Sequence, residues 1–305
     1  MSKLSKPKGM DLPTLVARYH DEDSCREYLE AIRWPDGPLC PRDEHKAYRI
    51  GTAGVWECSS CGYQFTVRVG TVLQDSKLPL SKWLIGTLLM VESKKGMSAN
   101  QLRRTLGTTY RTAWHLSHRI REAMSTANGS APLTGTVEVD ETYIGGKRRH
   151  VGRGYRGNKT MVLGAVERGG GIRLRVEPRT ADRTTLHEFI GKQVHNDATA
   201  IYTDQHVGYV GIGDANTKHE SVNHHAEEWV RGDVHTNTIE SAWSLFKRSI
   251  VGSYHNMSVK HMDKYLDEFE WRYNNRHNDY LFRDTLRALV KSEVLTYRRL
   301  IERPA

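Results

Sequence analysis

The order of alternating and helical patterns between residues 135 and 276 constrains the fold of this chain more than any other feature. β-branched runs that alternate with polar residues predict strands, and apolar residues at helical spacing predict helices. In chain order these are strands over 135–146, 159–168 and 170–178, a helix over 182–194 capped by Asp182, a strand over 198–206, a run compatible with a short strand over 219–225, and helices over 237–253, 258–276 and 283–299. This order predicts an α+β domain with a mixed sheet covered by helices.

The composition favours a polyanionic partner and argues against a membrane protein. The 305 residues carry a formal net charge of +9, which suits nucleic acids, although many basic proteins bind none. No apolar run reaches the roughly 18–20 residues of a membrane span, and no apolar signal segment follows the N-terminal lysines. We therefore expect a cytoplasmic protein without a membrane partner.

Two short cysteine motifs predict a zinc site. CSSC (58–61) supplies a complete C-x2-C pair, and CPRDEH (40–45) supplies one cysteine followed by an aspartate and a histidine. Tetrahedral zinc takes four ligands, usually in two close pairs, so each motif is expected to contribute two. The expected ligands are Cys40, His45, Cys58 and Cys61. Asp43 is the alternative to His45, because it occupies the place of the second cysteine in a C-x2-C pair.

A reading without metal also stays open, in which the cysteines are buried thiols. Cys25 lies in a predicted helix, DSCREYLEAIRW, and is expected to be a small buried residue rather than a ligand. A disulfide framework is disfavoured in a cytosolic protein of this length.

Residues 97–124 predict a helix-turn-helix, in which Leu102 and Leu106 close the first helix and Gly107 provides the turn. The outer positions of the second helix suit base edges and phosphates in a DNA major groove. Those positions are Arg111, Thr112, His115, His118 and Arg119. An ordinary helical hairpin with a solvated basic face is the alternative.

Three acids that are far apart in the sequence form a candidate metal site. Asp140 lies in the middle of a strand, where a charged side chain is costly unless it is paired or metal-bound. Asp204 ends a later strand, and Glu240 lies near the start of the following helix. Such an all-oxygen set suits Mg²⁺ or Mn²⁺, and two of these ions support in-line phosphoryl transfer. Lys247 shares the helix face of Glu240 and could hold a phosphate beside the metals.

Structural readings of the same helix stay open. Asn237 and Glu240 have the spacing of a capping box, which requires no catalysis. Lys247 would then be an ordinary exposed lysine. His235, just before the helix, either lies near the metals or has a capping or structural role.

Six motifs, spread over nearly the whole chain, carry a family resemblance. They are SKLPLSKW (76–83), TAWHLSHRIREAM (112–124), VEVDETYIGGK (137–147), YTDQHVGY (202–209), VHTNTIESAWSLFKR (234–248) and EWRYNNR (270–276). With these motifs the chain resembles the zinc-ribbon DDE transposases of bacterial insertion sequences, the family with an ISXO-like transposase domain. The resemblance implies an RNase H-like catalytic domain, a fold whose strand order the sequence also matches.

The resemblance also assigns roles to single residues. It implies that Asp140, Asp204 and Glu240 bind two Mg²⁺ or Mn²⁺ ions and that Lys247 binds the end of the element DNA. In many relatives the third position is assigned to an asparagine, which would be Asn237 here. Both residues are present in this sequence, and Glu240 is favoured.

A basic segment follows the first strand. GGKRRHVGRGYRGNK (145–159) contains six Lys or Arg residues and no acid, so it could form an arm over bound DNA. The expected contacts are Lys147, Arg148 and Arg149. A solvated loop is the alternative.

These predictions combine into a domain plan and a function. The plan has a zinc ribbon over 1–75, a helix-turn-helix domain over 76–128, a linker over 126–135, a catalytic domain over 135–282 and a helical tail over 283–305. In the ribbon, Asp43 replaces one of the four cysteines that are usual in the family. The predicted function is binding of terminal inverted repeats, metal-dependent 3′-end cleavage and strand transfer.

The partners follow from that function, and two alternatives remain. We expect double-stranded DNA, both terminal repeats and target, and a homodimer or larger assembly, in the bacterial cytoplasm at the nucleoid. A nuclease with the same fold that never joins strands is one alternative. A DNA-binding regulator with a dead catalytic domain is the other, and the intact acids count against it.

Overall fold

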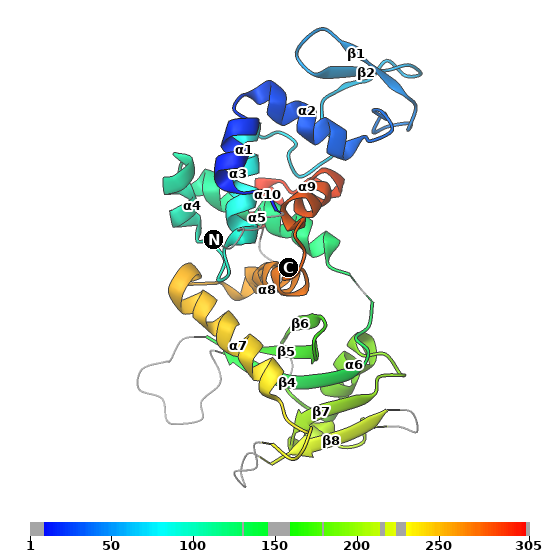
Figure 1. The fold of residues 1–305 in the computed structure, drawn as a ribbon, viewed down its shortest axis with the longest axis vertical. Coiled ribbons are helices and arrows are strands. Elements are labelled where there is room, and N and C mark those ends of the chain that lie inside the picture. The colour runs from blue at the N-terminus through cyan, green and yellow to red at the C-terminus, as the bar shows by residue number, and fades with distance from the viewer. Residues whose placement is uncertain are drawn as a thin grey trace, which may run out of the picture. The chain divides into compact units, whose positions relative to one another are not determined.

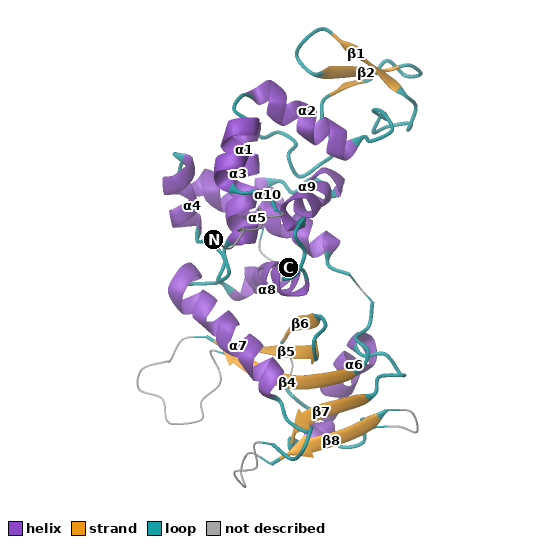
Figure 2. Ribbon diagram, in the orientation of Figure 1, coloured by secondary structure: helices purple, strands orange, loops and turns teal. Residues whose placement is uncertain are grey.

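The chain forms two compact units, one from Met1–Ala127 together with His277–Ala305, and the other from Asn128–Arg276. The computed structural model describes residues 9–129, 131–145, 159–178, 180–213, 217–223 and 230–302. Figure 1 labels the elements of each unit, and Figure 2 distinguishes helices from strands. Among the described residues, no helix is long and apolar enough to cross a membrane.

The first unit is mainly helical. Its helices are α1 (Leu12–Arg18), α2 (Glu22–Arg33), α3 (Leu80–Glu92), α4 (Ala99–Leu106), α5 (Tyr110–Ala127), α9 (Leu281–Lys291) and α10 (Tyr297–Ile301). Helix α9 packs against α2, α3 and α5, although the whole second unit lies between them in the sequence. The tail predicted to be helical over 283–299 contains two helices, α9 and α10, because extended backbone at Ser292 and Thr296 separates them.

Helices α4 and α5 form the predicted helix-turn-helix. The Ser98 side chain caps α4 by accepting a hydrogen bond from the Gln101 amide. Gly107 ends α4 in the left-handed region, at φ 58° and ψ 51°, where a residue with a Cβ atom would be strained. The apolar residues between the two helices are buried, at Leu102, Leu106, Ala113, Leu116 and Ile120.

The ribbon consists of three short antiparallel strands in the order β1-β2-β3. They are β1 (Ala47–Ile50), β2 (Val55–Cys58) and β3 (Gln64–Phe65). The edges of Trp56 and Phe65 pack against Trp34, which follows α2, and Cys40 and Cys58 are buried beside them. So small a core needs further support from a metal or from neighbouring helices.

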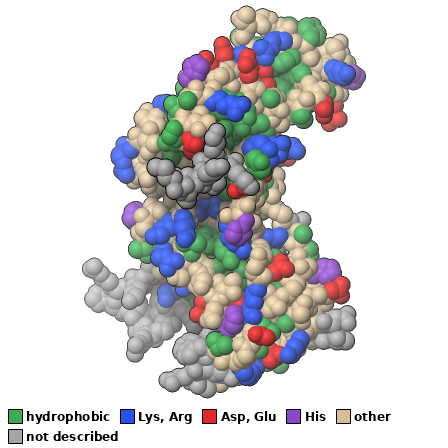
Figure 3. Space-filling model, in the orientation of Figure 1, with side chains coloured by type: hydrophobic (Ala, Val, Ile, Leu, Met, Phe, Trp, Pro, Cys, Tyr) green, Lys and Arg blue, Asp and Glu red, His purple; other side chains and the backbone are tan. Residues whose placement is uncertain are grey.

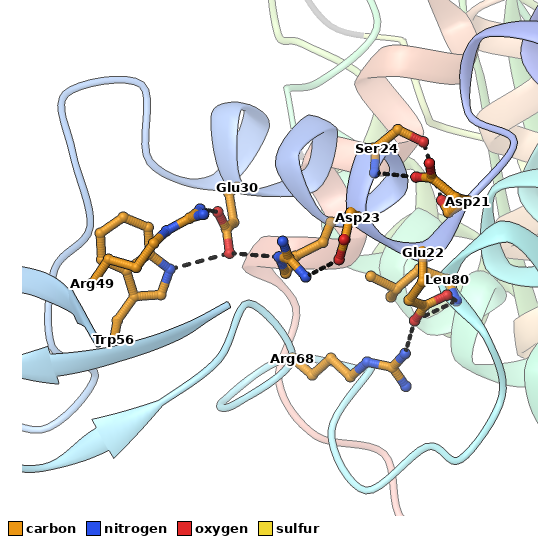
Figure 4. Close-up of polar contacts among 10 residues, drawn as sticks. Asp21, Glu22, Asp23, Ser24, Glu30, Arg49, Trp56, Arg68 and Leu80 are labelled. Carbon is orange, nitrogen blue, oxygen red and sulfur yellow. Dashed lines mark hydrogen bonds and ion pairs between the residues drawn. The ribbon is translucent and has the colours of Figure 1, made fainter. Parts of the chain in front are cut away.

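Carboxylates of α2 provide part of that support (Figure 4). Glu30 is 7% exposed and accepts hydrogen bonds from the Arg49 guanidinium at 2.7 Å and from the Trp56 indole at 3.1 Å, which both belong to the ribbon. At the other end of α2, Glu22 accepts the Leu80 amide at the start of α3 and an Arg68 nitrogen, at 2.8 and 2.7 Å. Helix α2 is therefore tied to both the ribbon and α3.

The second unit contains a five-stranded mixed sheet in the order β6-β5-β4-β7-β8. Its strands are β4 (Thr136–Ile144), β5 (Thr160–Glu167), β6 (Ile172–Glu177), β7 (Ala200–Asp204) and β8 (Lys218–Val222). The first three strands form an antiparallel meander, whereas β7 is parallel to both β4 and β8. This is the strand order of an RNase H-like sheet, which confirms the predicted fold class and the short strand near residue 220.

Helices cover the two faces of this sheet. Helix α6 (Arg183–Gln193), capped by Asp182 as predicted, packs on the face that includes Val137 and Val139 of β4. Helices α7 (Asn237–Ser249) and α8 (Met262–Asn274) pack on the face that includes Ile144. Odd-numbered residues of β4 therefore face α6, and even-numbered residues face α7.

The two long helices are shorter than the sequence pattern indicated. Helix α7 ends at Ser249 and continues as a π-helical turn, η3 (Ile250–Tyr254). A 3₁₀ turn, η4 (Val259–His261), precedes α8. Apolar periodicity does not distinguish such turns from regular α-helix, so the predicted ends at 253 and 258 were too generous.

We expect Gly164→Ala to destabilise the second unit by about 1–3 kcal/mol, because the added methyl would overpack the contact between sheet and α7. Gly164 lies opposite Asp140 in the β4–β5 ladder, and a Cβ there would be 2.5 Å from the Trp243 ring. Urea denaturation measures the free energy of unfolding. Gly191→Ala on α6, where a Cβ meets nothing within 4 Å, is the control and should be neutral or stabilising. Equal unfolding midpoints for the two variants would contradict this packing.

Candidate active site and metal centre

Asp140 and Asp204 lie on neighbouring strands of the sheet. In the parallel ladder between β4 and β7, Thr136 is opposite Ala200 and Glu138 is opposite Tyr202. Asp140 and Asp204 lie two residues beyond the last of these pairs, and the two carboxylates interact electrostatically. Alternation along both strands directs the two carboxylates toward the α7 face. The structure thus brings these two predicted site residues together.

The surroundings of Asp140 disfavour its negative charge. Burial, together with the neighbouring carboxylates of Glu141 and Asp204, raises the pKa of Asp140 to about 7. The Trp243 indole of α7 donates a hydrogen bond of 3.0 Å to Oδ2 of Asp140. A carboxyl group held in this way beside a second one is well suited to a divalent cation, which would neutralise the repulsion.

Glu240 lies in the first turn of α7, one turn before Trp243. Its Oε1 accepts a hydrogen bond of 3.0 Å from the Thr236 hydroxyl. Among the described residues, the cysteine cluster discussed below is the only group of three or more metal-ligating side chains whose atoms all lie within 4.8 Å of one another. The three acids are therefore not closed around a metal here, although Glu240 belongs to the helix that contacts Asp140.

A buried carboxylate that the sequence analysis missed anchors the start of α7. Glu138, on the same face of β4 as Asp140, accepts hydrogen bonds from the backbone amides of Thr238 and Ile239 at 2.7 and 3.0 Å. The N-cap residue is Thr236, so the capping-box reading of Asn237 and Glu240 is wrong. The sequence did contain a signal for this role, because Glu138 is a second acid in the same buried strand. It lies two residues before Asp140 and therefore on the same face.

A second missed pair lies on the opposite face of the sheet. Tyr209, in the 3₁₀ turn η1 (Val207–Tyr209) after β7, is 1% exposed and donates a hydrogen bond of 2.8 Å to Glu141. Burial raises the pKa of Tyr209 well above its usual value, and the negative charge of Glu141 adds to this effect. This bond connects the chain just after Asp140 to the turn just after Asp204.

The other site residues predicted in and just before α7 lie at its surface or beside its first turn. Asn237 is exposed at the first position of the helix, and Lys247 is exposed two turns after Glu240. Lys and Arg side chains gather over that end of α7 in Figure 3, where Arg248 is also exposed. His235 lies beside the α7 anchor, with Nδ1 2.9 Å from Arg168 Nη2, so its contacts are structural.

The cysteine motifs converge on one site in the ribbon. The ligand atoms of Cys40, Asp43, Cys58 and Cys61 all lie within 4.8 Å of one another. The Cys40 and Cys61 sulfurs are 3.8 Å apart, and the Cys58 sulfur is 3.2 Å from the Asp43 carboxylate. Backbone amides of Arg42 and Ser60 donate to the sulfurs of Cys40 and Cys58, as is usual around bound thiolates. This set supports a structural zinc ion.

The fourth member of the group is Asp43, the alternative to His45. The expected ligand His45 is outside the group: its side chain is exposed, and its Nδ1 is 3.0 Å from the Asp43 backbone carbonyl oxygen. Cys25 is fully buried in α2 and outside the group, as expected.

Comparison with known proteins identifies the two parts of the chain. Residues 132–274 match the ISXO2-like transposase domain, and residues 20–64 match the transposase zinc-ribbon domain. The chain belongs to this transposase family. It is also 28% identical over 278 residues to an uncharacterized protein in transposable element ISH50 of Halobacterium salinarum, covering 84% of this chain and 92% of that protein.

A weaker likeness exists among solved structures. The crystal structure of a pre-cleavage Mos1 transpososome is 12% identical, with a TM-score of 0.27, and the match covers 69% of this chain and 78% of that one.

In this family member the C-terminal segment covers part of the predicted recognition helix. His115 and Arg119 both contact the Leu295 carbonyl oxygen, at 3.2 and 3.0 Å, and Arg119 is 5% exposed. His118 is fully buried. Arg111 remains exposed, with its guanidinium over the Tyr297 ring at 4.1 Å, and Thr112 is half-buried. The residues predicted to contact DNA are therefore split between exposed and internal ones.

The basic arm is outside the part of the chain that the structure describes. Lys147, Arg148 and Arg149 belong to it, and only the ends of the predicted segment, Gly145 and Lys159, are described.

We expect the purified protein to contain one zinc ion and Cys58→Ser to lose it, lowering the thermal midpoint of the ribbon by more than about 5 °C. Metal content by mass spectrometry and thermal denaturation measure this. His45→Ala is the matched control and should keep its zinc, whereas Asp43→Cys should retain zinc against a chelator longer than the wild type. Loss of zinc in His45→Ala would show that the fourth ligand is wrongly assigned.

Proposed function

We propose that this chain binds the terminal inverted repeats of an insertion sequence, cleaves their 3′ ends in a metal-dependent reaction and joins them to target DNA. The observation that supports the proposal is that Asp140 and Asp204 come from neighbouring parallel strands and interact electrostatically, and that Trp243 of the helix bearing Glu240 donates to Asp140. Acids brought together from distant parts of the chain, rather than a Ser, Tyr or Cys nucleophile, suit direct transesterification.

The donor set fits Mg²⁺ or Mn²⁺. Asp140, Asp204 and Glu240 offer only carboxylate oxygens, which these hard cations prefer. The pKa of Asp140, raised by burial and then by neighbouring negative charge, reflects repulsion that a cation would relieve. Two bound ions would activate the attacking oxygen and stabilise the leaving oxygen of the phosphodiester.

The other residues of α7 would orient the DNA end. Trp243 donates a hydrogen bond to one oxygen of Asp140 and so orients that carboxylate. Lys247 is exposed and would bind a phosphate of the DNA end. Glu240 is favoured over Asn237 as the third metal ligand, because hard cations prefer carboxylate oxygens and Glu240 lies one turn from Trp243. The nucleophile is first water and then the freed 3′-hydroxyl.

DNA binding is assigned to the first unit and to the basic arm. The net charge of +9 provides long-range attraction to DNA phosphates. On α5 the proposed contacts narrow to Arg111 and Thr112, beside a cavity of about 540 Å³ that Lys77 and Thr108 also line. His115 and Arg119 contact the Leu295 carbonyl oxygen inside the unit, so they are no longer proposed as DNA contacts. Lys147, Arg148 and Arg149 remain the proposed DNA contacts of the basic arm. Two ends must be processed together, so we propose a homodimer or larger assembly on DNA at the nucleoid.

Asp140→Asn and Asp204→Asn should each reduce Mg²⁺-dependent cleavage of an oligonucleotide duplex carrying the flanking repeats by about 10²-fold or more, because each removes a charged metal ligand. DNA affinity, measured by electrophoretic mobility shift without divalent metal, should stay within about twofold. The control is Asp197→Asn, which alters an exposed carboxylate of the same unit. Cleavage at the wild-type rate by Asp140→Asn would refute the assignment.

The same assay with added target DNA separates transposition from simple hydrolysis. Covalently joined products are expected if the chain transfers strands. Hydrolysis without joining, under conditions in which two ends are synapsed, would favour the nuclease alternative. Loss of all metal-dependent cleavage in the wild-type protein would favour the regulator.

A further inference from the structure

Glu138 is buried in the centre of the second unit with every oxygen lone pair directed at a donor. Its side chain is 0% exposed. Oε2 accepts the amides of Thr238 and Ile239 at 2.7 and 3.0 Å, and Oε1 accepts the Thr238 hydroxyl at 2.8 Å and Arg168 Nε at 2.7 Å. A buried carboxyl group is costly without such bonds, and here four donors surround it.

These bonds hold the N-terminus of α7 against β4. The first amides of a helix have no partner within the helix, and a negative charge there also interacts favourably with the helix dipole. Arg168 extends the connection, because it donates to the carbonyl oxygens of Asp233 and His235 at 2.8 and 3.0 Å. The segment that leads into α7 and the first turn of α7 are thus fastened to one carboxylate of the sheet.

Glu240 lies between two attachment points of α7 on the same strand. Glu138 binds the amides of residues 238 and 239, and Asp140 binds the side chain of Trp243. Two residues of a strand span about 6.6 Å, and four residues of a helix rise about 6 Å, so the two spacings match. Helix α7 lies along the β4–β5 part of the sheet (Figure 1). The attachments before and after Glu240 fix the rotation of α7 about its axis and its position along β4.

We propose that Glu138 and Arg168 are positioning residues that hold Glu240 in register with Asp140 and Asp204 for divalent metal binding. This inference rests on the function proposed above, because it gives Glu240 a metal to bind. It predicts that loosening the anchor weakens metal binding even where the unit remains folded. Groups that orient metal ligands typically contribute 10–100-fold to metal affinity.

The chain offers a matched comparison for a purely structural role. Glu270 of α8 is also buried, at 6% exposed, and also binds one arginine and one backbone amide, Arg173 at 3.3 Å and Leu174 at 3.0 Å. It ties α8 to β6, away from the strands that carry the two aspartates. Glu138→Gln and Glu270→Gln therefore remove similar interactions but differ in their relation to Glu240.

The experiment measures Mn²⁺ binding to the full-length protein by isothermal titration calorimetry, with thermal denaturation of each variant without divalent metal. In Glu138→Gln the NH₂ group of the new side chain would face hydrogen-bond donors, which loosens the attachment of α7 to β4. The Mn²⁺ affinity should therefore fall about 10–100-fold. Arg168→Lys and Thr238→Val are milder and should weaken binding in the same direction, since each removes part of the anchor. Glu270→Gln should lower the thermal midpoint and leave Mn²⁺ affinity within about twofold.

The outcomes separate this inference from the proposed function. Asp140→Asn, measured in parallel, should abolish the Mn²⁺ site. If Asp140→Asn binds Mn²⁺ as the wild type does, the proposed metal site is wrong and the anchor has no metal to serve. If Asp140→Asn loses binding but Arg168→Lys and Thr238→Val keep wild-type affinity, the positioning role alone is overturned. The two milder variants decide the question if Glu138→Gln fails to fold.

Discussion

Strand β4 presents two carboxylates to one buried face, and the arrangement of the candidate site depends on them. Asp140 interacts with Asp204 of the neighbouring parallel strand, and Glu138 fastens the first turn of the helix that carries Glu240. One strand therefore provides both a metal ligand and the attachment of the helix that bears another. Ionised groups are expensive inside a protein, and here each is either saturated with donors or placed where a cation can neutralise it.

Acids on α2 have a similar fastening role in the first unit, where Glu30 is buried and Glu22 is exposed. Glu22 and Glu30, on α2, bind the start of α3 and the ribbon hairpin, so a domain with a very small core is supported from outside. The cysteine and aspartate group would provide the second support when it binds zinc, because it joins the loop at Cys40 to the hairpin end at Cys58 and Cys61. The ribbon thus depends on polar fastening more than on apolar burial.

The sequence was sufficient for the sheet, the helix-turn-helix and the facing of Asp140, because these depend on local periodicity. It was insufficient where a side chain acts across the fold. Glu138 looks like any polar residue of an alternating strand, and its partners lie about 100 positions later. Arg119 looks like a solvent-facing cation until the C-terminal segment is packed over it, with its bond to Leu295. The spacing of nearby residues indicates neither contact, because each joins residues that are far apart in the sequence.

The central claim is that Asp140, Asp204 and Glu240 form one divalent-metal site. Crystals of the protein soaked in Mn²⁺ test it most directly, because anomalous scattering locates the ion without reference to activity. The account predicts Mn²⁺ bound between Asp140 and Asp204, with a Glu240 oxygen within about 2.0–2.4 Å of it or of a second ion. Manganese bound elsewhere, with Glu240 still directed at Thr236 and no ion on the two aspartates, would contradict it.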